Sequence, residues 1–226
     1  MRATLYPVVV FDCDGVLLES NDVKTRAFVD VFADLPAHRD DAVAYHLTHM
    51  GIARDVKMRA ILTRIRGHVD ELEVAERSGR FAALIREGML SCPKVTGVDE
   101  ALEACSGRRT YVASGTPEAE LKQVLASRGL GAGFVAIYGS PATKPDILRR
   151  VISDEGVEPG AVLFIGDSQD DRSAAEAVGV GFVARTSHDP GLRSSGALPV
   201  VSDLRQLADF LQRLDLEGVH ESGWRR

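Results

Sequence analysis

The sequence has few of the features that mark secreted, membrane-embedded or nucleic-acid-binding proteins. Its three cysteines are an odd number at unpatterned spacings, which fits neither a disulfide framework nor a zinc site. No segment approaches the roughly 20 apolar residues needed to span a bilayer, and Asp12 interrupts the apolar run at 8–11 before it could serve as a signal-peptide core. The formal net charge is -6, without a clustered basic excess. We therefore expect a cytoplasmic protein with no membrane or nucleic-acid partner.

Apolar residues make up 45% of the 226 positions, enough for the core of one large domain or of one domain with a smaller insert. Short β-branched runs recur, and continuous apolar runs of this length are typical of strands buried on both faces of a parallel sheet. Amphipathic stretches with helical spacing lie between them. The strong strand candidates are 7–11, 109–113 and 161–165, the weaker ones 134–138, 180–183 and 198–201, and the helix candidates 118–128, 144–155, 173–178 and 203–214. This alternation predicts a doubly wound α/β fold.

Residues 18–90 depart from this alternation. They show helical periodicity and almost no strand signal, with successive helices indicated at 23–32, 55–65 and 71–87. Because this block follows the first strand and precedes a return to strand–helix alternation, we interpret it as an inserted, all-helical cap domain. The α/β core domain is then expected to comprise residues 1–17 and 91–226.

Polar residues follow several of the expected strands, where a doubly wound sheet places its ligand site. The segments are Asp12-Cys-Asp14-Gly after the first strand, Ser114-Gly-Thr after the second, Thr143-Lys144-Pro in a later loop and Gly166-Asp167-Ser-Gln-Asp-Asp171 after another strand. Carboxylates and a lysine that converge at one sheet edge need a hard divalent cation to organise them, and oxygen ligands of this kind suit magnesium.

The pair Asp12 and Asp14 suits the transfer of a phosphoryl group. A carboxylate can attack phosphorus and form an aspartyl-phosphate, which divides one difficult displacement into two easier ones. We predict that Asp12 is the nucleophile, while the metal and Lys144 neutralise the phosphoryl oxygens. A carboxyl two residues away can protonate the leaving alkoxide and then deprotonate the attacking water, which predicts Asp14 as general acid and base.

In this order the four segments resemble the motifs of the haloacid dehalogenase superfamily, a phosphatase-dominated group with a Rossmann-like core and a mobile cap. The resemblance covers essentially the whole chain, and four motifs in order are far more specific than any one of them. It implies that magnesium is bound by the Asp12 side chain, the Asp14 backbone carbonyl and Asp167, with Asp171 in support directly or through water.

The same resemblance implies roles for three further residues and for the insert. Ser114 and the Gly115 amide would hold phosphoryl oxygens, and Lys144 would pair with the nucleophile. The helical insert from residue 18 is similar to the caps of phosphoglycolate phosphatases and β-phosphoglucomutases, which also lie between the first and second motifs.

Other interpretations of these residues stay open from the sequence. Ser114 begins Ser-Gly-Thr-Pro-Glu, which is also a good helix start. Asp170 and Asp171 compete for the supporting role at the metal, and either could instead cap the helix that begins near Arg172. The family spacing favours Asp171. Lys144 could be a solvated surface lysine, although its place before a proline and a helix start suits an anion site.

The cap segment at 49–57 contains Arg54 and Lys57, three apart on one expected helical face. It is similar to the Gly-x-x-Arg stretch in the caps of β-phosphoglucomutase-like enzymes, which implies that Arg54 contacts an anionic substrate group distant from the reacting phosphate. A solvated basic face is the alternative for both residues. We interpret the four histidines of the cap as solvated surface residues, with His49 the first candidate for another role: His38, His46, His49 and His68.

From these residues and this resemblance we expect a magnesium-dependent phosphatase that acts on a small phosphorylated metabolite and works as a monomer. A β-phosphoglucomutase-like phosphosugar mutase is the alternative, because it uses the same aspartates and differs in whether the cap excludes water from the phosphoenzyme. Dehalogenases attack carbon and need neither the metal nor a second carboxyl, so Asp14 and Asp167 argue against that chemistry.

Overall fold

The computed structural model describes residues 5–186 and 199–217, and it confirms the expected parallel α/β architecture. Within these residues, six strands form one sheet in the order β3-β2-β1-β4-β5-β6, and all neighbouring strands run parallel. They are β1 (Val8–Phe11), β2 (Arg109–Pro117), β3 (Ala136–Ser140), β4 (Val162–Gly166), β5 (Gly181–Arg185) and β6 (Val200–Val201). The strand order reverses beside β1, which is where such sheets bind ligands.

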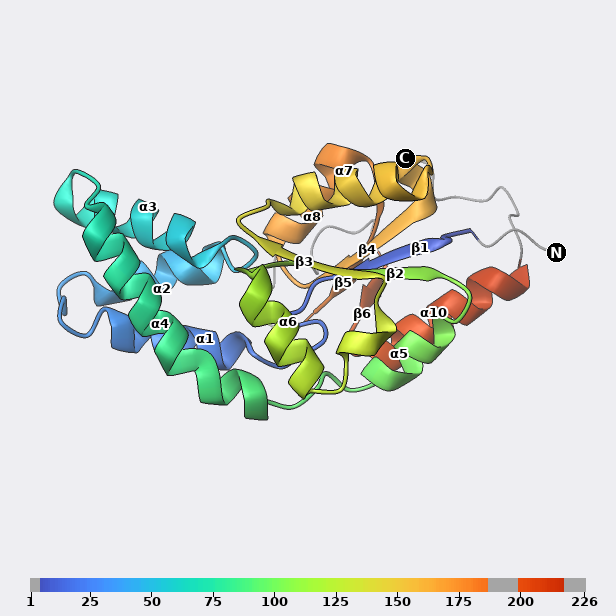
Figure 1. Cartoon of the computed structure of the whole chain (residues 1–226), viewed down its shortest axis with the longest axis horizontal. Helices are drawn as coiled ribbons and strands as arrows, with labels where there is room; N and C mark the ends of the chain where they lie inside the picture. Colours follow the sequence, from blue (N-terminus) through green and yellow to red (C-terminus); the bar gives the residue numbers. More distant parts are fainter. Residues whose placement is uncertain (1–4, 187–198, 218–226) are drawn as a thin grey trace.

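Helices cover both faces of the sheet (Figure 1). They are α5 (Val98–Ala104), α6 (Glu118–Ser127), α7 (Lys144–Glu155), α8 (Gln169–Val178) and α10 (Leu204–Glu217). The face with Val8 and Val10 packs against α7 and α8, and the face with Val9 and Phe11 packs against α5, α6 and α10. β1 and β4 are therefore buried along their whole length, which explains their continuous apolar sequences.

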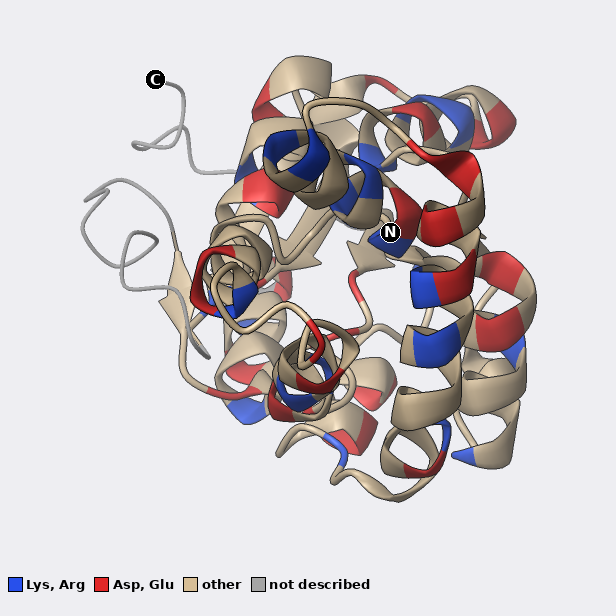
Figure 2. Ribbon diagram, turned by 90° about the vertical axis from the view of Figure 1, so that its left-hand side faces the viewer, with Lys and Arg blue, Asp and Glu red and all other residues tan. Residues whose placement is uncertain are grey.

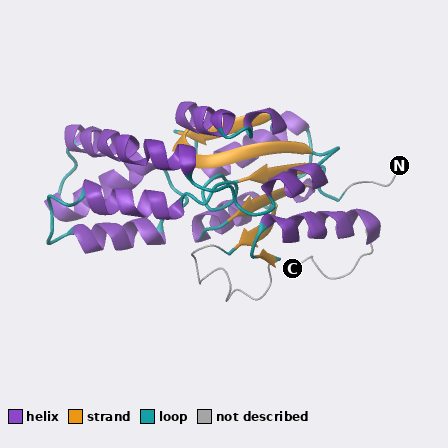
Figure 3. Ribbon diagram, turned by 90° about the horizontal axis from the view of Figure 1, so that it is seen from below, coloured by secondary structure: helices purple, strands orange, loops and turns teal. Residues whose placement is uncertain are grey.

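Further helices form a separate group at one end of the sheet, and this group contains helices and loops but no strand among its described residues (Figure 3). They are α1 (Asn21–Val31), α2 (Arg39–Thr48), α3 (Arg54–Arg66) and α4 (Glu71–Ser91). The predicted helices at 23–32, 55–65 and 71–87 correspond to α1, α3 and α4. No pattern in the sequence predicted α2, because only Ala42 and His46 of this helix are buried and no apolar stripe marks it.

Two neighbouring segments connect the sheet to this helical insertion. Leu18, on the outgoing segment, forms an antiparallel bridge with Lys94 on the returning one. Backbone hydrogen bonds on either side extend the pairing, from Glu19 N to Pro93 O (2.9 Å) and from Val95 N to the carbonyl of residue 17 (3.0 Å). The chain therefore leaves and re-enters the core at one place.

The insertion carries charges of both signs on its surface. In the view onto its outer end, basic and acidic residues are interspersed along the helices (Figure 2). None of the helices in residues 5–186 and 199–217 combines the length and the apolar character that a membrane crossing requires.

Candidate active site

The carboxyl ends of β1 and β4 bring two aspartates that are distant in sequence to one edge of the sheet. The two strands pair in register up to Phe11 and Ile165, and Asp12 N continues the ladder by donating to Ile165 O (2.9 Å). Asp167 follows the end of β4 by one residue. Both aspartates are buried, with 3% and 5% of their surface exposed.

Asp12 is held at both oxygens of its carboxylate. Oδ1 accepts a hydrogen bond from Cys13 N (2.7 Å), and Oδ2 accepts one from Lys144 Nζ (2.8 Å). Burial raises the pKa of Asp12, Lys144 opposes this rise, and the neighbouring aspartates add to it. The carboxylate therefore depends on nearby positive charge to stay ionised.

Lys144 bridges Asp12 and Asp171. Its Nζ also donates to Asp171 Oδ1 (2.5 Å), and all three side chains are buried. Burial opposes the charge on Lys144, but the two carboxylates raise its pKa above the ordinary value. Lys144 is the first residue of α7, whose N-cap Thr143 accepts a hydrogen bond from Asp146 N. The helix start thus fixes a protonated lysine beside Asp12, which excludes the solvated-surface interpretation.

The start of α8 fixes Asp171 through a capping box. Ser168 Oγ accepts from Asp171 N (3.2 Å), and Asp171 Oδ2 accepts from Ser168 N (3.1 Å) and Ser168 Oγ (2.5 Å). Asp170 has different surroundings, because its Oδ2 accepts a hydrogen bond from Gly51 N (3.1 Å) in the insertion. Asp171 therefore both caps α8 and contacts Lys144, whereas Asp170 contacts the insertion.

Three carboxylates meet closely enough to share a cation. One oxygen each of Asp12, Asp167 and Asp171 lie within 4.8 Å of one another. Three buried like charges are costly unless a cation compensates them, and hard oxygen donors fit Mg²⁺. Asn21 Nδ2 donates to Asp167 Oδ2 (2.7 Å), and a Cβ added at Gly15 would lie 1.8 Å from the same oxygen. The donor set fits magnesium, and its surroundings leave Asp167 little freedom.

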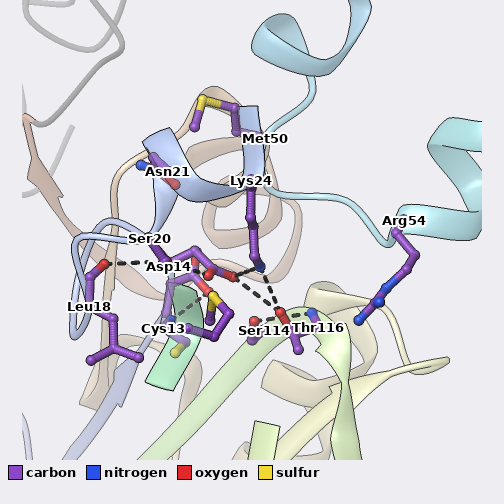
Figure 4. Close-up of polar contacts among 12 residues, drawn as sticks. Cys13, Asp14, Leu18, Ser20, Asn21, Lys24, Met50, Arg54, Ser114 and Thr116 are labelled. Carbon is purple, nitrogen blue, oxygen red and sulfur yellow. Dashed lines mark hydrogen bonds and ion pairs between the residues drawn. The ribbon is translucent and has the colours of Figure 1, made fainter. Parts of the chain in front are cut away.

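Asp14 lies at the centre of a hydrogen-bond cluster between the sheet edge and α1 (Figure 4). Oδ1 accepts from Ser20 Oγ (2.6 Å), and Oδ2 accepts from Lys24 Nζ (2.5 Å) and Thr116 Oγ1 (3.2 Å). Burial opposes ionisation, but Lys24 and Ser20 outweigh it and lower the pKa of Asp14 to about 2. The side chain is therefore a carboxylate near neutral pH.

β2 continues beyond residue 113, where the sequence predicted its end, so Ser114 and Gly115 belong to the strand. Ser114 is fully buried, and its Oγ accepts a hydrogen bond from Thr116 N (3.2 Å). A Cβ added at Gly115 would come within 3.0 Å of Gly51 O, so the insertion approaches the strand closely here. α6 begins only at Glu118, and Ser114 does not cap it.

A small cavity that is partly open to solvent lies between the sheet edge and the insertion. It is lined by Asp12, Asp14, Gly115, Thr116 and Lys144 from the core and by Lys24, Phe28, His46, Met50, Ile52, Arg54, Lys57 and Phe81 from the insertion. Arg54 and Lys57 are both buried and share this cavity with the predicted nucleophile. The structure therefore excludes a solvated basic face for these two residues.

The two cations of α3 have different partners. Arg54 Nη2 forms an ion pair with Glu120 Oε2 of α6 (2.5 Å), which joins the insertion to the core. Lys57 Nζ lies 3.2 Å from His46 Nδ1 and donates to Met50 O (3.3 Å).

His46 corrects the interpretation of the cap histidines as surface residues. Only 1% of its surface is exposed, and its ring stacks on Phe28 with centroids 4.1 Å apart. It lies on α2, the helix that the sequence did not predict, so no apolar pattern indicated its burial. His49 stacks on Tyr45 and does not line the cavity of the predicted nucleophile.

The sequence also missed Lys24 as a partner of Asp14. A signal was available: Ser20 and Asn21 stand at a helix start, and Lys24 lies three residues after Asn21 on the same helical face. All three contact a predicted site residue, since Ser20 and Lys24 bind Asp14 and Asn21 binds Asp167.

The chain is similar to known proteins in sequence and in fold. A family model described as haloacid dehalogenase-like hydrolase matches residues 6–179. The phosphoglycolate phosphatase of Rhodospirillum rubrum is 30% identical over 219 residues, which cover 90% of each chain. A 5′-nucleotidase of Pseudomonas aeruginosa is 27% identical and covers 93% of this chain and 97% of its own length. The crystal structure of a predicted phosphoglycolate phosphatase from Haemophilus somnus shares the fold, with a TM-score of 0.73, 23% identity and coverage of 93% and 98%.

Proposed function

The chain belongs to the haloacid dehalogenase-like hydrolases, and from this membership we propose that it is a magnesium-dependent phosphatase. It hydrolyses a small phosphorylated metabolite through an aspartyl-phosphate. One observation carries the proposal: Asp12, Lys144 and Asp171 form a buried row of charged groups at the sheet edge, and Asp167 adds a third carboxylate beside them. Such a set suits a phosphoryl group, whose transferred oxygens need positive charge around them.

Asp12 supplies the nucleophile. Its contacts with Lys144 and Cys13 N orient the carboxylate before a substrate arrives, which lowers the cost of reaching the attack geometry. One oxygen of Asp12 bonds to phosphorus as the ester P–O bond breaks, and the leaving alkoxide takes a proton from Asp14. A water molecule then attacks phosphorus, its proton passes to Asp14, and the bond to Asp12 breaks to release inorganic phosphate.

Asp14 must be protonated for the first half of this reaction and ionised for the second. Lys24 holds it ionised in the structure. A bound phosphoryl group would compete with Asp14 for the ammonium of Lys24, and a weaker ion pair would raise the pKa of this buried carboxyl. Substrate binding would therefore favour the protonated form of Asp14 that the first step requires.

Asp12, Asp167 and Asp171 are the side chains that would hold Mg²⁺, together with the backbone carbonyl of Asp14. The bound ion supplies positive charge that stabilises the phosphoryl oxygens in the transition state. Asn21 keeps Asp167 oriented through its hydrogen bond to Oδ2.

Substrate binding is shared between the core and the insertion. Ser114 and the amide of Gly115 hold phosphoryl oxygens, and Arg54 and Lys57 contact the rest of the molecule. For the described residues, we propose the division expected from the sequence, with a core domain within 1–17 and 91–226 and a cap at 18–90. The paired crossing segments around Leu18 and Lys94 support this division.

The relatives named phosphoglycolate phosphatase and 5′-nucleotidase align over nearly the whole chain, and they support a phosphorylated metabolite as the substrate. The cytoplasmic location and the monomeric state stay predictions from the sequence.

Turnover of para-nitrophenyl phosphate with and without Mg²⁺ tests the proposal. We expect activity that requires added magnesium and disappears with EDTA. Asp12→Asn deletes the nucleophile at nearly constant volume and should lower kcat by at least about 10⁴-fold. Asp55→Asn, at an exposed carboxylate of α3, is the matched control and should keep wild-type turnover. Near-wild-type turnover in Asp12→Asn would exclude the proposed nucleophile.

A screen of phosphorylated metabolites then separates hydrolysis from mutase activity. We expect inorganic phosphate to appear in step with the loss of a substrate. Formation of an isomeric phosphosugar that requires a catalytic bisphosphate would instead establish the mutase.

A further inference from the structure

Arg185 is a buried cation that the proposed reaction does not use. It is the last residue of β5, and its side chain is 9% exposed. Ala184 pairs with Gly166 of β4, so Arg185 and Asp167 each stand one residue beyond that pair. The predicted strand at 180–183 stopped short of this residue. Arg185 thus lies at the same edge of the sheet as the proposed active site.

Every nitrogen of the Arg185 guanidinium donates a hydrogen bond. Nη2 and Nη1 donate to the two carboxylate oxygens of Glu19 (2.6 and 3.0 Å), Nη1 also donates to Gly15 O (2.9 Å), and Nε donates to Ser202 O (3.3 Å). The paired contact with Glu19 fixes the plane of the guanidinium and balances its charge. The N–H that binds Gly15 is therefore held in a set direction.

Gly15 lies in the turn that carries Asp14. Its φ of +69° falls in the left-handed region, which glycine enters freely but does not hold by itself, because it has more accessible conformations than any other residue. Bonds within the turn close it, since Gly15 N donates to Leu18 O (2.8 Å) and Leu18 N donates to Cys13 O (3.0 Å). The contact from Arg185 comes from another strand, so it fixes the turn relative to the sheet.

Holding Gly15 also fixes the carbonyl that precedes it. A trans peptide unit is planar, and its N–H and C=O point in opposite directions. Because Gly15 N donates to Leu18 O, the Asp14 carbonyl points away from Leu18. That carbonyl is one of the groups proposed to hold Mg²⁺. Gly15 also lies against a second such group, since an added Cβ would overlap Asp167 Oδ2. A shift of Gly15 would therefore disturb two proposed ligands at once.

Glu19 extends the same contact to the segment that enters the insertion. Its backbone N donates to Pro93 O (2.9 Å) on the returning segment. Two residues further along, Asn21 donates to Asp167 Oδ2. By binding Glu19, Arg185 anchors the start of this segment to the sheet.

We infer that Arg185 is a positioning residue for the proposed magnesium site and acts through the carbonyl of Gly15. Its guanidinium holds the turn after β1, so that the Asp14 carbonyl and the Asp167 side chain are already arranged before the ion binds. The inference rests on the proposed magnesium-dependent function, because it concerns the same site. It gives Arg185 no contact with the substrate and no share in proton transfer.

Magnesium binding without substrate tests the inference. Arg185→Met removes the guanidinium and keeps a long side chain. Loss of a group that orients metal ligands weakens metal binding about 10–100-fold, so we expect calorimetric titration to give a Kd for Mg²⁺ raised by this factor. The Mg²⁺ concentration at half-maximal turnover of para-nitrophenyl phosphate should rise as well. Arg205→Met, at an exposed arginine of α10, controls for the loss of one positive charge and should change neither value.

Two further variants separate the contact with Gly15 from the ion pair with Glu19. Arg185→Met leaves Glu19 without its cation, which destabilises the fold whatever the function. The double variant Arg185→Met with Glu19→Gln removes both charges, so urea unfolding in EDTA should show a smaller loss of stability. Its Kd for Mg²⁺ should stay raised, because Gly15 O still lacks its donor. Glu19→Gln alone keeps that donor and should bind Mg²⁺ as the wild type does.

The outcomes separate this inference from the proposed function. A raised Kd in the double variant, with Glu19→Gln and Arg205→Met unchanged, supports the inference, and it does so even where Arg185→Met fails to fold. A wild-type Kd in the double variant overturns it, as does an equal loss of binding in Glu19→Gln, which would assign the effect to the ion pair. A wild type that neither binds Mg²⁺ nor requires it for turnover overturns the proposed magnesium-dependent function, and the inference with it.

Discussion

Lys24 Nζ donates a hydrogen bond to Asp14 Oδ2 at 2.5 Å and thereby joins the first helix of the insertion to the proposed acid and base of the core. The same ammonium donates to Thr116 Oγ1 (2.8 Å), so it also reaches the end of β2. Burial opposes the ionisation of Asp14, yet Lys24 and Ser20 lower its pKa from 3.8 to about 2. The stabilising effect of this ionised side chain is fully present above about pH 4 and is lost as the pH falls through about 2.

Lys24→Met should therefore destabilise the fold in a pH-dependent manner. The variant leaves Asp14 buried without its cation, at a cost of about 2 kcal/mol at pH 6 from the lost pKa shift. The difference in unfolding free energy from the wild type should shrink as the pH falls from 4 to 2, because Asp14 becomes protonated in both proteins. Urea unfolding in EDTA at several pH values measures this difference. The exposed Arg26 lies on the same helix, and Arg26→Met should show no such trend.

Asp14→Asn should slow the reaction by an amount that depends on the leaving group. The amide cannot donate a titratable proton to the alkoxide, so alkyl phosphates should lose about 10²–10⁴-fold in kcat. Aryl phosphates leave as weaker bases and should lose less. Steady-state kinetics on ethyl phosphate and para-nitrophenyl phosphate provides the comparison. Equal losses on both substrates would contradict the proposed acid role.

Asp167→Ala should raise the magnesium requirement sharply, because the proposed magnesium site would lose one of its three carboxylates. The Mg²⁺ concentration at half-maximal activity measures the requirement, and calorimetric titration with Mg²⁺ measures binding without substrate. Asn21→Ala removes the hydrogen bond to Asp167 and should produce a weaker shift in the same direction. If Asp167→Ala needs no more magnesium than the wild type, Asp167 is not a ligand of the metal.

Asp171→Ala should damage activity far more than Asp170→Ala. Asp171 is fully buried, contacts Lys144 and belongs to the group of three carboxylates, whereas Asp170 accepts a hydrogen bond from Gly51 N. The loss of Asp171 leaves Lys144 with one carboxylate partner and deletes half of the capping box of α8. Parallel measurements of kcat, magnesium requirement and unfolding free energy compare the two variants. If Asp170→Ala were the more damaging substitution, the supporting role at the metal would belong to Asp170.

The sheet was predictable from the sequence because its central strands are buried on both faces. Val8–Phe11 and Val162–Gly166 are apolar throughout, so no partner needed to be known before they could be recognised. The site positions were predictable for a related reason: parallel strands bring the residues after their carboxyl ends together, whatever their distance along the chain. Asp12 and Asp167 are brought together in this way.

The contacts of the insertion were not predictable in the same way. Helices α1, α2 and α3 place Lys24, His46 and Lys57 around one cavity, and their neighbours depend on how the helices pack. No alternation or motif encodes that packing, and α2 itself lacks an apolar stripe. Arg54 illustrates the limit, since its motif indicated a contact with the substrate but gave no sign of its ion pair with Glu120.

The paired crossing segments have a consequence for how this enzyme could change during evolution. Because Leu18 and Lys94 are bridged, the two points at which the insertion joins the sheet are neighbours in space. A short turn could close the chain at that point and leave the order and register of β1 to β6 intact. The four helices could therefore be exchanged, lengthened or lost as one block while the nucleophile stays in place. Changes in the four helices could then alter substrate preference while the catalytic residues of the sheet edge stay the same, even though one gene encodes both parts.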